Sequence, residues 1–122
     1  MAKILVVDDE PEVCKMLEKF LESKGNTVYK AYSGEMALKM VKEERPHIVL
    51  LDIKMPGMSG LECLAKIMEI DKNLGVIMIT AIKEEEIGRE AMKLGAYDYI
   101  TKPLDLNYLE ECLNWKIFQM TA

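Results

Sequence analysis

The chain has 122 residues, of which 16 are lysine or arginine and 21 are aspartate or glutamate, so its formal net charge is −5. This length is typical of one domain, and half of the residues are hydrophobic, which argues against a disordered chain. Contacts with nucleic-acid phosphates need clustered cations, so an acid excess with only two arginines argues against nucleic acid as a direct partner. We therefore expect one domain that covers residues 1–122.

The cysteines and the apolar runs bear on the cellular compartment. Cys14, Cys63 and Cys112 are far apart and odd in number, which argues against a disulfide framework or a zinc site and favours a reducing cytoplasm. No apolar run approaches the ~18 residues that a membrane span needs. The apolar start of the chain is too short for the core of a signal peptide. We expect a cytoplasmic protein without a membrane partner.

The first half of the chain alternates short apolar runs with segments of helical period. Residues 4–7 and 27–31 are predicted strands. The helix between them is expected to begin near Pro11 and to end at Gly25. A second helix should begin at Ser33 and end before Pro46. The predicted apolar faces of these two helices are Val13, Met16, Leu17, Phe20 and Leu21, and then Met36, Ala37, Met40 and Val41.

The second half repeats this alternation three times. Residues 48–51, 76–79 and 97–101 are predicted strands. Ser59 and Glu62 form a capping box that predicts the start of the third helix. The acidic run 84–86 is predicted to form the first turn of the fourth helix, and Gly95 is predicted to end that helix. Asp105 is predicted to cap the fifth helix. Trp115, Phe118 and Met120 suit either the core or a surface for a partner.

The five strand–helix units predict an α/β fold. Strands that are apolar along their whole length are buried on both faces, which indicates a parallel sheet covered by helices. Five units are too few for an eight-fold barrel. An open, doubly wound sheet remains, and in such sheets functional sites lie at the carboxyl ends of the strands.

Polar residues follow four of the five predicted strands. Asp8 and Asp9 follow the first, Asp52 the third, Thr80 ends the fourth, and Lys102 follows the fifth. The second strand ends in Ala31-Tyr32, which offers less chemistry. In a doubly wound sheet the other four strand ends border one crevice. We therefore expect three carboxylates, a hydroxyl and an ammonium group in one pocket.

Three carboxylates at short range repel one another, so either one carries a proton or a hard cation lies among them. Oxygen ligands without histidine or thiolate favour Mg²⁺ over zinc or copper. A carboxylate beside Mg²⁺, a lysine and a hydroxyl is suited to nucleophilic attack on phosphorus, which gives an aspartyl phosphate. A carboxylate nucleophile needs no general base.

Four segments of the sequence resemble the receiver domain of two-component response regulators. Residues 4–10 resemble the opening acidic pair of that family, and residues 51–57 resemble its phosphorylation segment. Residues 78–81 contain the hydroxyl-bearing residue followed by a small residue that is typical of the family, and residues 95–103 match its fifth-strand signature. The four segments occur in order and cover nearly the whole chain. The resemblance implies a flavodoxin-like fold of five parallel strands in the order 2-1-3-4-5.

The resemblance also implies roles for individual residues. Asp52 would accept a phosphoryl group from the phosphohistidine of a sensor histidine kinase or a phosphotransfer protein. Asp8, Asp9, Asp52 and the backbone carbonyl of Lys54 would hold Mg²⁺. Lys102 would contact a phosphoryl oxygen. The protein would be a signalling switch rather than an enzyme, since it would catalyse only its own phosphorylation and slow dephosphorylation.

The family's switch residues correspond to Thr80, which would move toward the phosphoryl group, and Tyr99, which would rotate inward. The face formed by the fourth helix, the fifth strand and the fifth helix would then change shape. Its output would be transcription in a longer regulator, or a protein partner for a stand-alone domain. A phosphorylation-dependent dimer through this face is a further expectation.

Two positions depart from common usage in the family. Lys54 and Ile82 stand where many receivers carry amide or acidic side chains that influence a hydrolytic water. We hypothesise that the aspartyl phosphate of this chain is relatively long-lived, because neither side chain accepts a hydrogen bond from water. His47, the only histidine, precedes a strand and is predicted to be a surface residue away from the pocket.

Three other functions are alternatives to a phosphorylation switch. A phosphohydrolase of the haloacid-dehalogenase type uses a second aspartate where this chain has Lys54. A flavin mononucleotide binder needs a loop rich in hydroxyls and glycine after the first strand, whereas residues 8–10 are acidic. A degenerate receiver that acts only as a scaffold is disfavoured by the intact set of Asp8, Asp9, Asp52, Thr80 and Lys102.

Overall fold

Strands and helices alternate strictly along the chain in the computed structural model, which describes residues 2–121. The strands are β1 (Lys3–Val7), β2 (Thr27–Ala31), β3 (Ile48–Leu51), β4 (Gly75–Thr80) and β5 (Asp98–Thr101). The helices are α1 (Pro11–Ser23), α2 (Gly34–Glu44), α3 (Gly60–Ile70), α4 (Glu85–Lys93) and α5 (Leu106–Thr121). All ten predicted elements are present, and their bounds differ from the predicted ones by a residue or two.

The strands form one parallel sheet in the order β2-β1-β3-β4-β5. This is the predicted flavodoxin-like order. The last residue of β1, Val7, pairs with Ala31 of β2 and with Leu51 of β3, so these strands end at the same level. The order reverses at β1, which places the crevice of the fold beside the ends of β1 and β3.

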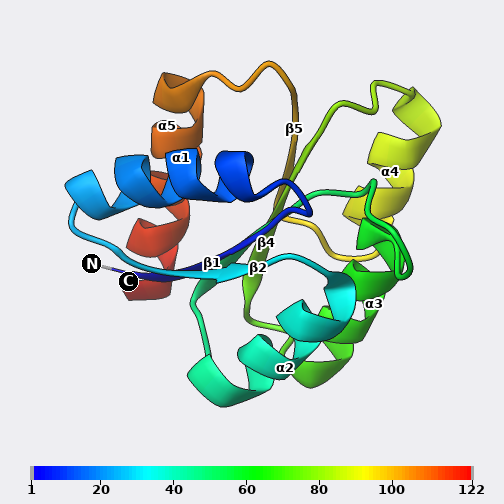
Figure 1. Ribbon diagram of the computed structural model, residues 1–122, viewed down its shortest axis with the longest axis horizontal. Coiled ribbons are helices and arrows are strands. Elements are labelled where there is room, and N and C mark those ends of the chain that lie inside the picture. The colour runs from blue at the N-terminus through cyan, green and yellow to red at the C-terminus, as the bar shows by residue number, and fades with distance from the viewer. Residues whose placement is uncertain (1, 122) are drawn as a thin grey trace.

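Helices cover both faces of the sheet (Figure 1). One buried cluster joins the sheet to α1 and α5, and the other joins it to α2, α3 and α4. Successive β1 residues alternate between them: Ile4 and Val6 belong to the first cluster, Leu5 and Val7 to the second. Both faces of the sheet are apolar, and each such side chain contributes about 1.5–3 kcal/mol when buried, so packing on both sides stabilises the sheet that carries the carboxyl edge.

Local signals in the sequence set the helix boundaries as predicted. The hydroxyl oxygens of Ser33 and Ser59 accept hydrogen bonds from the amide groups three residues on, at 3.1 and 3.2 Å. Asp105 caps α5 by accepting from two amide groups of its first turn. Gly25 and Gly95 follow α1 and α4 with φ of 90° and 112°, in the left-handed region that glycine adopts without strain.

Some predicted core residues lie on the surface instead. Met16 and Met36 were placed on the apolar helix faces, but their side chains are 43% and 40% exposed. The buried residues of these helices form narrower sets, which are Cys14, Leu17 and Leu21 in α1 and Gly34, Ala37 and Val41 in α2. Trp115, Phe118 and Met120 are also exposed, which excludes the core interpretation for them.

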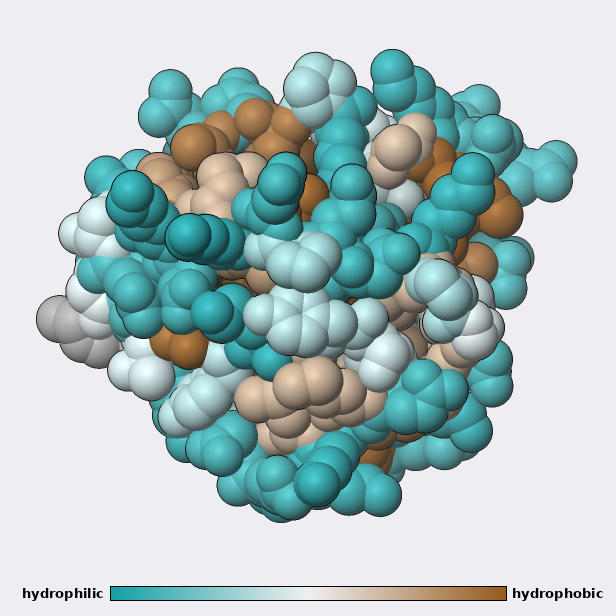
Figure 2. Space-filling view, viewed as in Figure 1, coloured by the Kyte–Doolittle hydropathy of each residue, from teal (hydrophilic) through white to brown (hydrophobic). Residues whose placement is uncertain are grey.

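The molecular surface is largely hydrophilic on the face that Figure 2 shows, with hydrophobic residues in small groups. Within residues 2–121, no helix has both the length and the apolar character that a membrane crossing requires.

Candidate functional site

Three residues that directly follow strands are held at the carboxyl edge of the sheet by backbone hydrogen bonds. The amide of Asp8 donates to the last carbonyl of β2 at 3.1 Å, and that of Asp52 donates to the last carbonyl of β1 at 3.0 Å. The amide of Lys102 donates to the last carbonyl of β4 at 2.8 Å. These bonds extend the sheet pattern by one residue, so the positions of the three side chains follow from strand register.

The structure brings the three predicted carboxylates together. Asp8, Asp9 and Asp52 each offer an oxygen within 4.8 Å of the others. Asp8 and Asp52 are only 3% and 6% exposed, and Asp9 is more open to solvent. At this separation each pair of full charges repels by about 1–3 kcal/mol, depending on the local dielectric. The edge of the sheet is therefore a site of concentrated negative charge.

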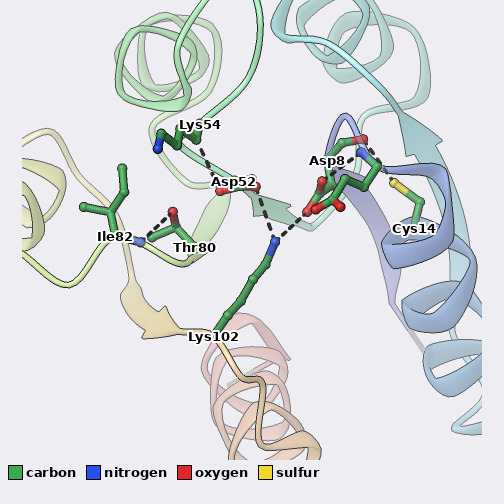
Figure 3. Close-up of polar contacts among 8 residues, drawn as sticks. Asp8, Cys14, Asp52, Lys54, Thr80, Ile82 and Lys102 are labelled. Carbon is green, nitrogen blue, oxygen red and sulfur yellow. Dashed lines mark hydrogen bonds and ion pairs between the residues drawn. The ribbon is translucent and has the colours of Figure 1, made fainter.

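Lys102 lies between two of these carboxylates (Figure 3). Its Nζ is 3.1 Å from Oδ2 of Asp8 and 3.4 Å from Oδ2 of Asp52. Burial alone would lower the pKa of Lys102, but the hydrogen bond to Asp8 and the charge of Asp52 outweigh it and raise the pKa. The lysine therefore stays charged at neutral pH, yet one cation does not balance three carboxylates.

Thr80 and Tyr99 are connected through the segment that follows β4. Thr80 is fully buried, and its Oγ1 accepts a hydrogen bond from the amide of Ile82 at 3.3 Å. The hydroxyl of Tyr99 donates to the carbonyl oxygen of the same Ile82 at 2.7 Å. Burial raises the pKa of Tyr99, and the nearby charges of Glu84 and Asp52 raise it further, so the phenol keeps its proton. Movement of the Thr80 hydroxyl would therefore disturb a segment that also holds Tyr99.

Lys54 begins the loop that leads away from Asp52. Its amide lies 3.4 Å from Oδ1 of Asp52, while its side chain is exposed. Ile82 is half-buried and also borders the site (Figure 3). An ammonium group and an aliphatic chain thus occupy the two positions at which the resemblance to receivers implies side chains that influence a hydrolytic water.

Two residues near the site were not assigned a role from the sequence. Cys14 of α1 donates its thiol to the carbonyl oxygen of Asp8 at 3.4 Å, and burial together with Asp8 raises the pKa of this thiol to about 11. Gly60, the first residue of α3, donates its amide to the carbonyl of Ile53 at 2.7 Å. The sequence feature that could have pointed to Cys14 is its position on the buried face of α1. For Gly60, that feature is its position directly after the capping residue Ser59.

His47 lies at the opposite edge of the sheet, as predicted. It is exposed, and its Nδ1 accepts a hydrogen bond from the amide of Lys3 at the start of β1. It takes no part in the acidic cluster.

The donor set of the cluster suits a hard divalent cation. Within residues 2–121, Asp8, Asp9 and Asp52 form the one group of three acidic, histidine or cysteine side chains with ligand atoms at such short range. All three offer carboxylate oxygens, and the nearby Cys14 thiol is directed at a backbone carbonyl. Oxygen donors of this kind prefer Mg²⁺ or Ca²⁺ to zinc or copper.

Comparison with known proteins shows the family of this chain. The model of the response regulator receiver domain family matches residues 4–114. The chain therefore belongs to the family of response regulator receiver domains.

Individual relatives extend this result. The chain is 38% identical to Sporulation initiation phosphotransferase F of Bacillus subtilis over 111 residues, which cover 91% of this chain and 90% of that protein. It is 40% identical to Transcriptional regulatory protein ZraR of Salmonella typhimurium over 90% of this chain, which spans only 25% of that protein.

Solved structures show the same fold. A two-component response regulator from Clostridium difficile has a TM-score of 0.96 and 27% identity, with full coverage of both chains. The CheX-CheY-BeF3-Mg²⁺ complex from Borrelia burgdorferi contains a chain with a TM-score of 0.88 and 35% identity, covering 98% of this chain and 89% of that one.

Because the three carboxylates of the cluster repel one another, removing the charge of one of them should stabilise the folded protein when no divalent cation is present. Asp9→Asn should raise the free energy of unfolding by about 1 kcal/mol in buffer with a chelator, because the most exposed member of the cluster loses its charge. Thermal unfolding with and without the substitution measures this. Glu90→Gln, an equal charge change on exposed α4, is the control and should have a much smaller effect. A lower melting temperature for Asp9→Asn in chelator would contradict the electrostatic account.

Proposed function

We propose that this receiver domain is a phosphorylation-activated switch in which Asp52 accepts a phosphoryl group in a Mg²⁺-dependent reaction. The observation that carries the proposal is the position of Lys102, which bridges Asp8 and Asp52 beside a third carboxylate. The arrangement provides a nucleophile, ligands for a divalent cation and a cation for a phosphoryl oxygen at one edge of the sheet.

Transfer from phosphohistidine needs no general base on this chain. The Oδ–P bond to Asp52 forms as the P–N bond breaks, and the leaving imidazole keeps that electron pair and takes a proton from solvent. Asp8, Asp9, Asp52 and the carbonyl of Lys54 are the residues that would hold Mg²⁺, which neutralises charge on the phosphoryl oxygens. Lys102 adds a second positive charge and orients the incoming group.

The response would pass through Thr80 and Tyr99. A phosphoryl oxygen on Asp52 is a stronger acceptor for the Thr80 hydroxyl than any neutral group nearby. Rotation toward it would break the contact with the amide of Ile82, whose carbonyl holds Tyr99. Tyr99 would then change position, and with it the surface of α4, β5 and α5.

The donor would be a sensor histidine kinase or a phosphotransfer protein, and the reaction would take place in the cytoplasm. The output would be either transcription, as the name of the ZraR relative suggests, or a protein partner. The phosphorylation-dependent dimer through α4, β5 and α5 stays a prediction.

Acetyl phosphate with Mg²⁺ tests the proposal directly. The intact protein should gain the mass of one phosphoryl group, and chelation of the metal should abolish the gain. Asp52→Ala should not be modified, whereas Asp71→Ala, a matched change at the end of α3, should react like the unsubstituted chain. Modification of Asp52→Ala at the normal rate would rule out Asp52 as the acceptor.

The environment of Asp52 predicts a slow loss of the phosphoryl group. Neither the exposed ammonium of Lys54 nor the aliphatic chain of Ile82 accepts a hydrogen bond from an attacking water. Lys54→Asn and Ile82→Glu should therefore shorten the lifetime of the aspartyl phosphate, measured as phosphate release after removal of the donor. If neither substitution speeds release, these positions do not control the lifetime.

A further inference from the structure

The loop between Asp52 and α3 is closed by a direct contact between two backbone segments. The amide of Gly60 donates to the carbonyl of Ile53 at 2.7 Å. Ser59 caps the helix that starts here, with its hydroxyl on the amide of Glu62. The start of α3 is thereby fastened to the residue that follows Asp52.

The space at this contact admits no side chain at residue 60. A Cβ built on Gly60 would lie 2.1 Å from the carbonyl oxygen of Asp52 and 2.5 Å from Cα of Ile53. These are backbone atoms, so the clash cannot be relieved by turning a side chain. Glycine is required here for close approach and not for a positive φ, because the backbone of Gly60 does not adopt that region.

The residues enclosed by this contact include the backbone of Lys54. The amide of Lys54 lies against Oδ1 of Asp52, and its carbonyl is the backbone ligand expected for the cation. That carbonyl therefore belongs to a loop, directly after Asp52, whose two ends meet at the contact between Ile53 and Gly60. Asp52 itself is held at the end of β1, because its amide donates to the carbonyl of Val7. A shift of the start of α3 would therefore move the Lys54 carbonyl relative to the three carboxylates.

We infer that Gly60 is a positioning residue of the acidic site: its bare Cα lets α3 close directly on the backbone after Asp52 and so sets the place of the Lys54 carbonyl for the cation. The inference rests on the proposed function, since it concerns the Mg²⁺ site of that reaction. Gly60 touches neither the cation nor the phosphoryl group.

The test compares two glycines at which an added Cβ would be crowded. A Cβ on Gly75, the first residue of β4, would meet the flexible Lys116 side chain, with Cε at 2.7 Å, which can turn away. Mg²⁺ affinity is measured by calorimetry for the full chain and for Gly60→Ala and Gly75→Ala. We expect Gly60→Ala to weaken Mg²⁺ binding about 10- to 100-fold. Gly75→Ala lies at the opposite edge of the sheet and should change the affinity by no more than about twofold, because it disturbs no ligand.

Two milder substitutions test the same role if Gly60→Ala does not fold. Ser59→Ala and Ser33→Ala each remove one helix cap, at 3.2 and 3.1 Å, and should lower stability similarly. Only Ser59→Ala loosens the helix that closes on Asp52, so only it should weaken Mg²⁺ binding and slow phosphorylation by acetyl phosphate. Equal Mg²⁺ affinity in both members of each folded pair would overturn the role of Gly60 while leaving the proposed function intact. Failure of the unsubstituted chain to bind Mg²⁺ would overturn both.

Discussion

The repulsion among Asp8, Asp9 and Asp52 is the interaction on which the site depends. Parallel register ends β1 and β3 at one level, and the buried faces of the sheet prevent the strands from slipping to separate the charges. Lys102 offsets part of the repulsion from the end of β5. The fold thus holds an excess of negative charge that a divalent cation would offset.

Contacts lead from this edge in two directions. On one side, the hydroxyl of Thr80 accepts a hydrogen bond from the amide of Ile82, and the hydroxyl of Tyr99 donates one to the carbonyl of Ile82. The site is thereby linked to the face of α4 and β5. On the other side, Gly60 fastens α3 to the backbone carbonyl of Ile53, the residue directly after Asp52. The first link has a hydroxyl that can rotate and suits a switch, whereas the second consists of backbone against backbone and suits a fixed support.

Strand ends and helix caps were predictable from the sequence because each follows from local rules. The apolar runs give the strands, and Ser59 and Asp105 mark helix starts through their own hydrogen bonds. The gathering of Asp8, Asp52 and Lys102 follows from the parallel fold. Tertiary packing decided the rest: the exposure of Met16 and Met36 depends on how wide a stripe each helix buries, and the need for glycine at residue 60 depends on a backbone in another element.

The most direct test of the account is a crystal structure of the protein with Mg²⁺ and beryllofluoride, which mimics a phosphoryl group. The account predicts one Mg²⁺ bound by Asp8, Asp9, Asp52 and the carbonyl of Lys54, with beryllofluoride on Asp52 and Lys102 on one of its fluorines. It also predicts that Thr80 leaves the amide of Ile82. A structure in which Mg²⁺ and beryllofluoride are absent from this edge, or bind without Asp52, would contradict it.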